Sequence, residues 1–180
     1  MSERGKRWTG KLTAARLTPL AAAVAVYLLA TLFTDAHFMA DTADYVDSVA
    51  AYERGVNYDF WEFGHLFWRP IGWLCFKVQS LFTGAQGEAE ARAQIVWTLL
   101  VINWLAGLVA VVCLYNLVKV VSKREWAAAL AAAAFIFSHG FLNYAQTGSS
   151  YAPGLALLTL GLWLLARAGE RGDDSWRAAA

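Results

Sequence analysis

The sequence predicts an all-α, polytopic membrane protein with four transmembrane helices and an outer-leaflet loop that carries short interfacial helices. Apolar residues make up 58% of the 180 residues and charged residues only 16%, against roughly 45–50% and 25% in an average soluble domain. The mean hydropathy is +0.40. A soluble chain of this composition would have to expose a large apolar surface, so a lipid bilayer is the expected partner.

The charge balance excludes one large class of partners. The chain has 15 basic and 14 acidic residues, a formal net charge of +1. Proteins that bind nucleic acid present a strongly basic surface to the phosphate backbone. We therefore expect no nucleic-acid partner.

Stretches without charge mark the expected spans, because a membrane-crossing helix needs about 20 mostly apolar residues. Residues 17–34 and 94–118 carry no charged side chain, and residues 126–166 continue without one for 41 positions. One helix of that length would measure roughly 60 Å, about twice the hydrocarbon thickness, so this stretch is expected to form a hairpin. Pro153 suits the first turn of its second helix. The predicted spans are 17–34, 94–118, 126–143 and 151–166, with an outer turn at 144–150.

The basic residues give the expected orientation, since cytoplasmic loops are enriched in lysine and arginine. With four spans, residues 1–16, 119–125 and 167–180 together hold 11 of the 15 basic residues. A fifth span over 66–82 would move two of these clusters outside. We therefore expect both termini in the cytoplasm, in a multi-pass protein of the cytoplasmic (inner) membrane. The first span is expected to be an uncleaved anchor, and residues 35–93 are expected to lie outside.

The outer segment, residues 35–93, is predicted to carry the function and to contain two helices. Residues 41–54 are expected to form a helix that ends at Gly55, with Tyr45, Val49 and Tyr52 on one face. Residues 66–82 are expected to lie on the membrane as an amphipathic helix. Its apolar face would contain Phe67, Ile71, Leu74, Val78, Leu81 and Phe82, and its opposite face Arg69, Gly72, Gln79 and Ser80. The tryptophans of this segment suit either the headgroup zone or contact with the flat faces of sugars.

Acidic residues gather at the start of the outer segment, and two interpretations of them stay open. Asp41 and Asp44 stand where an N-cap and a first-turn acid of a helix would stand. Alternatively, His37, Asp41 and Asp44 face one Mg²⁺ or Mn²⁺, an ion that takes oxygen ligands readily. The second arrangement needs a substrate phosphate to complete the coordination.

A second candidate cluster precedes the interfacial helix. His65 and Arg69 bring an imidazole and a guanidinium together, and a guanidinium binds phosphate through a planar pair of donors. The phosphate is either that of a substrate or that of a lipid headgroup. His139, in the third predicted span, is expected to be a hydrogen-bonded core residue.

The order of these features resembles the N-terminal part of the GT-C fold of membrane glycosyltransferases, to which protein O-mannosyltransferases and lipid A aminoarabinose transferases belong. The family's outer loop carries Asp-Glu-x-x-Tyr or a near variant, and here Asp41 and Tyr45 match while Thr42 takes the place of the glutamate. A His-Pro-Pro-like motif follows in the family, and His65 to Pro70 occupies its place. The resemblance covers about residues 17–167.

The resemblance implies an inverting transfer of a sugar from a polyprenyl-phosphate donor to an acceptor hydroxyl on the outer face of the membrane. Asp41, or failing it Asp44, would be the general base, and Arg69, His65 or a divalent ion would stabilise the leaving phosphate. Members of the family usually have seven or more spans. Further transmembrane helices from a C-terminal part are therefore expected as partners.

Two other functions compete with this one. The first is a non-catalytic membrane module or subunit, which would be a truncated homologue that assembles with the missing helices. The second is a small-solute transporter, for which polar groups at mid-membrane depth are typical. Asn103 and His139 are the main polar side chains in the predicted spans, so the transporter ranks third.

Overall fold

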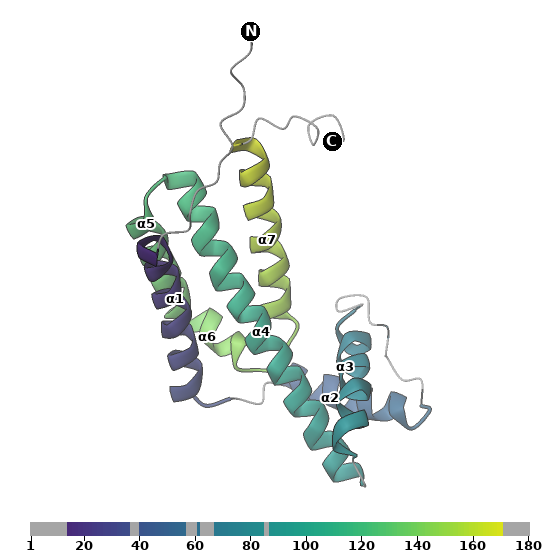
Figure 1. Ribbon diagram of the computed structural model, residues 1–180. Helices are drawn as coiled ribbons and strands as arrows, with labels where there is room; N and C mark the ends of the chain where they lie inside the picture. Colours follow the sequence, from purple (N-terminus) through teal and green to yellow (C-terminus); the bar gives the residue numbers. More distant parts are fainter. Residues whose placement is uncertain (1–13, 37–39, 57–60, 62–66, 85–86, 171–180) are drawn as a thin grey trace.

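The computed structural model describes residues 14–36, 40–56, 61, 67–84 and 87–170 of the chain. These residues form seven α-helices and no strand, which confirms the all-α prediction for this part of the chain (Figure 1). The helices are α1 (Ala14–Phe33), α2 (Ala40–Glu53), α3 (Trp68–Thr83), α4 (Glu88–Ser122), α5 (Glu125–Ile136), α6 (His139–Ala145) and α7 (Tyr151–Glu170).

The 35-residue helix α4 is the axis of the fold and contacts each of the other six helices. Helices α1 and α5 lie along one side of it and α7 along another (Figure 1). Helices α2 and α3 pack on its first turns, which the sequence had placed in the outer segment. Residues 88–93 therefore continue the predicted span 94–118 as one helix.

Two helices, α4 and α7, are long and apolar enough to cross a membrane, and the pair α5–α6 makes a third if it is counted as one broken span. The apolar part of α1, Pro19–Phe33, is shorter than these. At 1.5 Å per residue its 15 residues reach roughly 22 Å, short of the roughly 30 Å of hydrocarbon.

The predicted span 126–143 is not one straight helix. Helices α5 and α6 meet at an angle of 66°, and the break falls at Phe137 and Ser138. The Ser138 side chain accepts a hydrogen bond from the backbone N–H of Phe141, at 3.3 Å, and so caps α6. This serine satisfies an orphan amide in the first turn of a new helix, and α6 packs against α4 and α7 (Figure 1).

Close backbone approach holds α1 against α4. Tyr27 of α1 is buried, and its hydroxyl donates a hydrogen bond of 2.9 Å to the carbonyl oxygen of Trp104. A Cβ atom added to Gly107 would collide with the Tyr27 ring. Small residues at helix crossings are the usual means of close packing in membranes.

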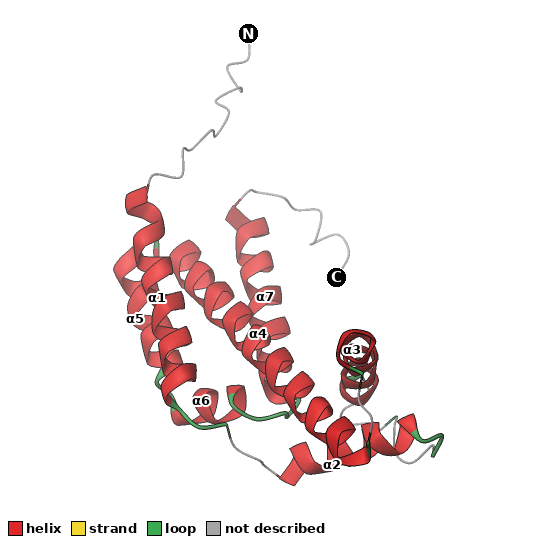
Figure 2. Ribbon diagram, turned by 60° about the horizontal axis from the view of Figure 1, so that its bottom comes forward, coloured by secondary structure: helices red, strands yellow, loops and turns green. Residues whose placement is uncertain are grey.

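Helix α3 exposes its predicted apolar face and buries Trp68, Arg69, Gly72 and Phe76. The predicted apolar face is exposed along its whole length, whereas Arg69 and Gly72 are buried against the other helices. The Gln79 side chain accepts a hydrogen bond from Thr98 of α4. Figure 2 looks along the axis of α3 and sees α1, α4 and α7 from the side, so α3 runs across the direction of the long helices. That α3 lies on a membrane surface stays a prediction.

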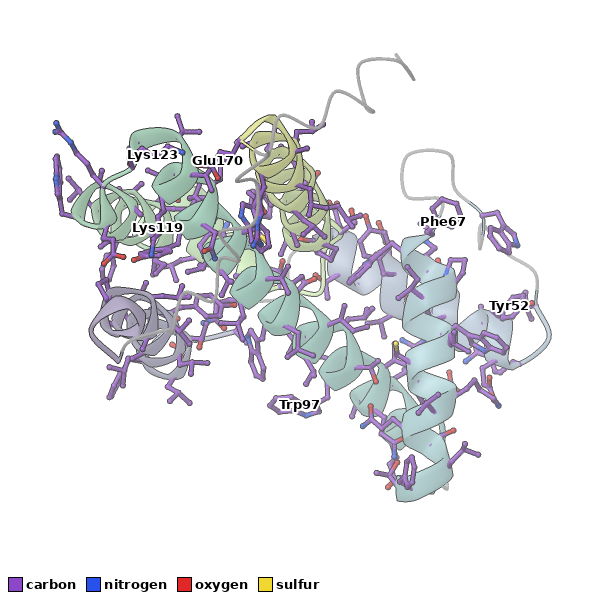
Figure 3. All side chains as sticks on the ribbon, turned by 45° about the horizontal axis from the view of Figure 1, so that its top comes forward. Tyr52, Phe67, Trp97, Lys119, Lys123 and Glu170 are labelled. Atoms are coloured by element: carbon purple, nitrogen blue, oxygen red, sulfur yellow. The ribbon has the colours of Figure 1, made fainter. Side chains whose placement is uncertain are left out.

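Ion pairs close the end of the bundle opposite α2 and α3. Lys119 of α4 pairs with Glu125 of α5 at 2.7 Å, and Lys123 pairs with Glu170 of α7. Figure 3 shows Lys123 beside Glu170 at this end. The pairs tie the end of α4 to the start of α5 and to the end of α7.

A buried polar network holds the turn between α6 and α7. Asn103 of α4 is fully buried, and its side-chain amide donates to the carbonyl oxygens of Tyr144, Thr147 and Ser149, the last at 2.8 Å. The turn runs through residues 146–150, and Gln146 to Ser149 are also buried. Backbone groups without water need partners within the protein, and Asn103 supplies them.

We expect Asn103→Leu to destabilise the fold by about 2 kcal/mol, because its two amide N–H groups are shared by three buried carbonyl oxygens and a buried acceptor left without a donor costs about 1–3 kcal/mol. For a chain of this size that is a fall in Tm of roughly 4–8 °C, measured by circular dichroism in detergent. Asn116→Leu is the matched control, because Asn116 of the same helix bonds only to the Val112 carbonyl one turn earlier. Equal losses in the two variants would contradict the anchoring role.

Candidate functional site

Helix α2 forms as the sequence predicts, one residue earlier at each end. Tyr45 and Val49 are buried toward α3 and α4, while Tyr52 is half-buried with its ring edge-on to Trp73, 5.2 Å between centroids. Gly55 follows the helix at φ +79°, the left-handed conformation that favours glycine. The structure thus fixes which side of α2 faces inward.

The two predicted catalytic acids lie in different surroundings at the start of α2. Asp41 is half-buried, and Asp44, nearly one turn later, is exposed. Thr42, between them, is buried. Because Asp41 is the less hydrated carboxylate, it is the better placed of the two to act on a bound group.

Helices α2 and α3 meet at one residue of the α6–α7 turn. The N–H of Gly148 donates to the Thr42 hydroxyl oxygen at 3.1 Å, and the carbonyl oxygen of Gly148 accepts from the Trp68 indole N–H at 3.0 Å. Thr42 follows Asp41 in the chain, and Trp68 precedes Arg69. The two predicted site residues therefore flank the two side chains that clamp Gly148, and we call this junction the Gly148 clamp.

Arg69 lies in the protein rather than at the lipid surface. Its side chain is only 6% exposed, and its guanidinium carbon is 5.4 Å from the centroid of the Tyr45 ring. A cation over an aromatic face is stabilised by the ring quadrupole. The contact brings Arg69 to the same face of α2 as Asp41, since Asp41 and Tyr45 are one helical turn apart.

Two predicted site residues, His37 and His65, lie outside the described residues. Within the described part of the chain, no group of three His, Cys, Asp or Glu side chains is arranged to hold a metal ion. The predicted Mg²⁺ or Mn²⁺ site of His37, Asp41 and Asp44 thus stays a prediction, with only its two carboxylates located.

Ion pairs hold α2 in place on its exposed side. The Glu53 carboxylate accepts from Lys77 at 2.7 Å and from the Trp73 indole at 2.9 Å, both on α3. Asp47 pairs with Arg92 of α4 at 2.5 Å. Burial raises the pKa of the Glu53 carboxyl, but the hydrogen bonds from Lys77 and Trp73 and the charge of Lys77 outweigh it, so the net pKa is lowered.

A polar cavity, which the sequence did not predict, lies at the end of α1 against the α5–α6 bend. Its volume is about 530 Å³, and its polar lining includes Asp35, His139 and Gln146. His139 is exposed at the start of α6, so the expectation of a core histidine is wrong. The reason is the break at Ser138, which turns this residue out of the packed face.

An apolar groove of about 350 Å³ lies on the other side of α1, against α4. It is lined by Tyr27, Leu28, Thr31 and Leu32 of α1 and by Val101, Trp104, Leu105 and Leu108 of α4. The Trp104 indole donates to the Gln146 side-chain oxygen at 3.2 Å. The groove and the polar cavity are therefore separated by the Trp104–Gln146 hydrogen bond.

Comparison of the chain with protein-family models, with curated proteins and with solved structures found no match. The geometry of the chain itself carries the functional argument.

We expect Gly148→Ala to open the Gly148 clamp, because an added Cβ would lie 2.7 Å from Thr42 Cγ2 and 3.1 Å from Leu99 Cβ. Relieving the first contact rotates the threonine and breaks its hydrogen bond. Cleavage of α2 by a protease under native conditions should become at least several-fold faster. Gly140→Ala is the control, since nothing lies within 4 Å of its added Cβ. An unchanged cleavage rate in Gly148→Ala would contradict the clamp.

We expect the free energy of unfolding to decrease as the pH falls below 4.5, which is the ordinary pKa of the Glu53 carboxyl. The lowered pKa means that the folded state favours the ionised carboxylate. Its contribution is therefore fully present above 4.5 and is lost as the pH falls through the lower, folded-state pKa. Glu53→Gln should show a smaller fall in Tm than the native chain over this range. Asp44→Asn, at an exposed acid of the same helix, should follow the native curve, and a Glu53→Gln curve that does so too would contradict the prediction.

Proposed function

We propose that the chain is an integral membrane glycosyltransferase of the inverting, GT-C-like kind, or its N-terminal part. It takes a sugar from a polyprenyl-phosphate donor and passes it to an acceptor hydroxyl on the outer face of the cytoplasmic membrane. The observation that carries the proposal is the contact of the Arg69 guanidinium with the Tyr45 ring, because Tyr45 lies one helical turn after Asp41. The Gly148 clamp holds the starts of α2 and α3 at the same end of the bundle.

The direction of the helices supports four crossings. The starts of α1 and α5 and the ends of α4 and α7 lie at one end of the bundle, while α2, α3 and α6 lie at the other (Figure 1). Lys119, Lys123, Arg124 and Arg167 belong to the first end. In the proposed topology this end is cytoplasmic, both termini lie there, and α1 crosses a locally thinned bilayer.

The apolar surfaces support a lipid-linked substrate. The groove between α1 and α4 suits a hydrocarbon chain, because its lining is apolar and it lies along the spanning helix α4. The exposed apolar face of α3 lies across the helix direction (Figure 2), which places it along the membrane surface. A polyprenyl chain in the groove would carry its phosphate toward the outer end, where α1 gives way to α2.

In the proposed reaction, Asp41 accepts the proton of the acceptor hydroxyl as its oxygen attacks the anomeric carbon. The bond from that carbon to the phosphate oxygen breaks, and the polyprenyl phosphate leaves. The anomeric carbon has the inverted configuration in the product. Arg69 offsets the negative charge of the leaving phosphate, with His65 as its proposed second partner. A divalent ion would supply further positive charge, but the described residues alone do not form its site, and no step here depends on it.

A non-catalytic membrane module is the second candidate. One observation favours it: the polar cavity, the apolar groove and the small pocket between α2 and α4 are not lined by Asp41, Asp44 or Arg69 in the described part of the chain. Such a module would contribute α4 and α7 to a larger assembly. Catalysis by the protein separates the two candidates.

The test uses the full protein in detergent with polyprenyl-phosphate hexoses labelled in the sugar. Asp41→Asn should lower release of free polyprenyl phosphate by at least about 10²-fold, because a general base contributes 10²–10⁴ to the rate, while the Tm and the binding of the donor stay unchanged. Asp44→Asn should keep most of the activity. If Asp44→Asn is the inactive variant, the base is Asp44. If the double variant turns over like the native protein, or the native protein consumes no donor, the enzyme proposal is wrong.

A further inference from the structure

The polar cavity at the end of α1 is lined by polar, charged and aromatic side chains. Its lining comes from three places in the chain: the end of α1, the α5–α6 bend, and the end of α6 with the residue after it. The eight lining residues are Phe33, Thr34, Asp35, Phe137, His139, Leu142, Asn143 and Gln146. Asp35 is the one charged residue among them, so the cavity carries a negative formal charge.

The polar groups at the back of the cavity are already engaged. The Gln146 amide nitrogen donates to the Thr31 carbonyl oxygen at 3.1 Å and to the Thr34 hydroxyl at 2.6 Å, and its oxygen accepts from Trp104. Thr34 in turn donates to the Ala30 carbonyl oxygen at 2.6 Å. These groups form a rigid wall and have no remaining N–H or O–H to offer a ligand.

Asp35 and His139 differ from this wall. Both side chains are exposed, and neither makes a hydrogen bond or ion pair with another described residue. Asp35 lies just after α1 and His139 lies at the start of α6. The Asp35 carboxylate accepts hydrogen bonds only, so it suits a ligand group that donates N–H.

The rim of the cavity adds two aromatic rings. Phe33 is 85% exposed and Phe137 is 65% exposed, and both line the cavity. Aromatic faces attract cations, more strongly where water is partly excluded. A carboxylate with two exposed rings is the combination that recognises an alkylammonium group, and charge-assisted hydrogen bonds are roughly twice as strong as neutral ones.

We propose that this cavity binds a primary ammonium group, either of an ethanolamine lipid headgroup or of a free small amine, with Asp35 as the counter-ion and the Phe33 and Phe137 rings around the cation. This site is separate from Asp41 and Arg69, and it does not depend on the glycosyltransferase proposal. A sugar or polyol would also find acceptors here, but it would gain nothing from the negative charge.

The test compares ethanolamine with ethylene glycol, a ligand of similar size that has a hydroxyl in place of the ammonium. The full protein, labelled at the Cε1 carbons of its histidines, is titrated in detergent at constant pH and ionic strength, and His139→Gln assigns the His139 signal. Ethanolamine should shift that signal in a saturable way, and ethylene glycol should not. Asp35→Asn should weaken ethanolamine binding at least about tenfold, a loss of about 1.4 kcal/mol. Asp47→Asn is the charge-matched control, because Asp47 is an exposed acid that does not line the cavity, and it should bind like the native chain.

Nanodiscs of phosphatidylcholine with and without phosphatidylethanolamine distinguish the two sources. A shift of the His139 signal that requires phosphatidylethanolamine and disappears in Asp35→Asn supports the headgroup. A shift with ethanolamine but not with the lipid supports a free amine. If ethylene glycol shifts the signal as much as ethanolamine does, or if Asp35→Asn binds ethanolamine as tightly as the native chain, the proposal is wrong. It is also wrong if neither ethanolamine nor phosphatidylethanolamine shifts the signal.

Discussion

The hydrogen bonds from Asn103 to the α6–α7 turn are the interaction on which the outer end of the molecule depends. The turn is irregular and buried, so its carbonyl oxygens cannot rely on water. Asn103 holds it from α4, Gln146 ties it to the end of α1, and Gly148 bonds to both α2 and α3. These hydrogen bonds join the turn to four helices, α1, α2, α3 and α4. The positions of Asp41 and Arg69 follow from where the turn is held.

Periodicity and turn signals predicted the local structure well. The range of α2, its end at Gly55, the place of Pro153 and the two faces of α3 all follow from local spacing. The bend between α5 and α6 was missed, although Ser138 before His139-Gly140 is the pattern of a helix start. Residues 126–143 are predicted as one span because hydropathy does not detect a capping side chain.

The clamp itself was beyond the reach of the sequence. Asn103 and Ser149 are 46 positions apart, and Thr42 and Gly148 are 106 apart. No local pattern pairs a threonine in one helix with a glycine in a distant turn. The orientation of α3 was easier to predict. Its apolar stripe includes Leu81 and Phe82, and Arg69 lies on the other side. A helix of this kind suits a place between protein and lipid. Without lipid, the exposed apolar face of α3 would be unstable in water. The bilayer is therefore part of the explanation of the fold.

The polar cavity and the Gly148 clamp lie on either side of the same turn, only two residues apart along the chain at Gln146 and Gly148. Ligands at the two places would influence each other only if the turn had two arrangements of similar free energy. Its contacts argue against that. Gln146 uses both its donors and its acceptor, Gly148 uses its N–H and its carbonyl oxygen, and Asn103 bonds to three carbonyl oxygens at once. A second arrangement would break several of these bonds in a place without water to replace them. The turn therefore acts as a fixed wall, and an amine in the cavity leaves the geometry of Asp41 and Arg69 unchanged.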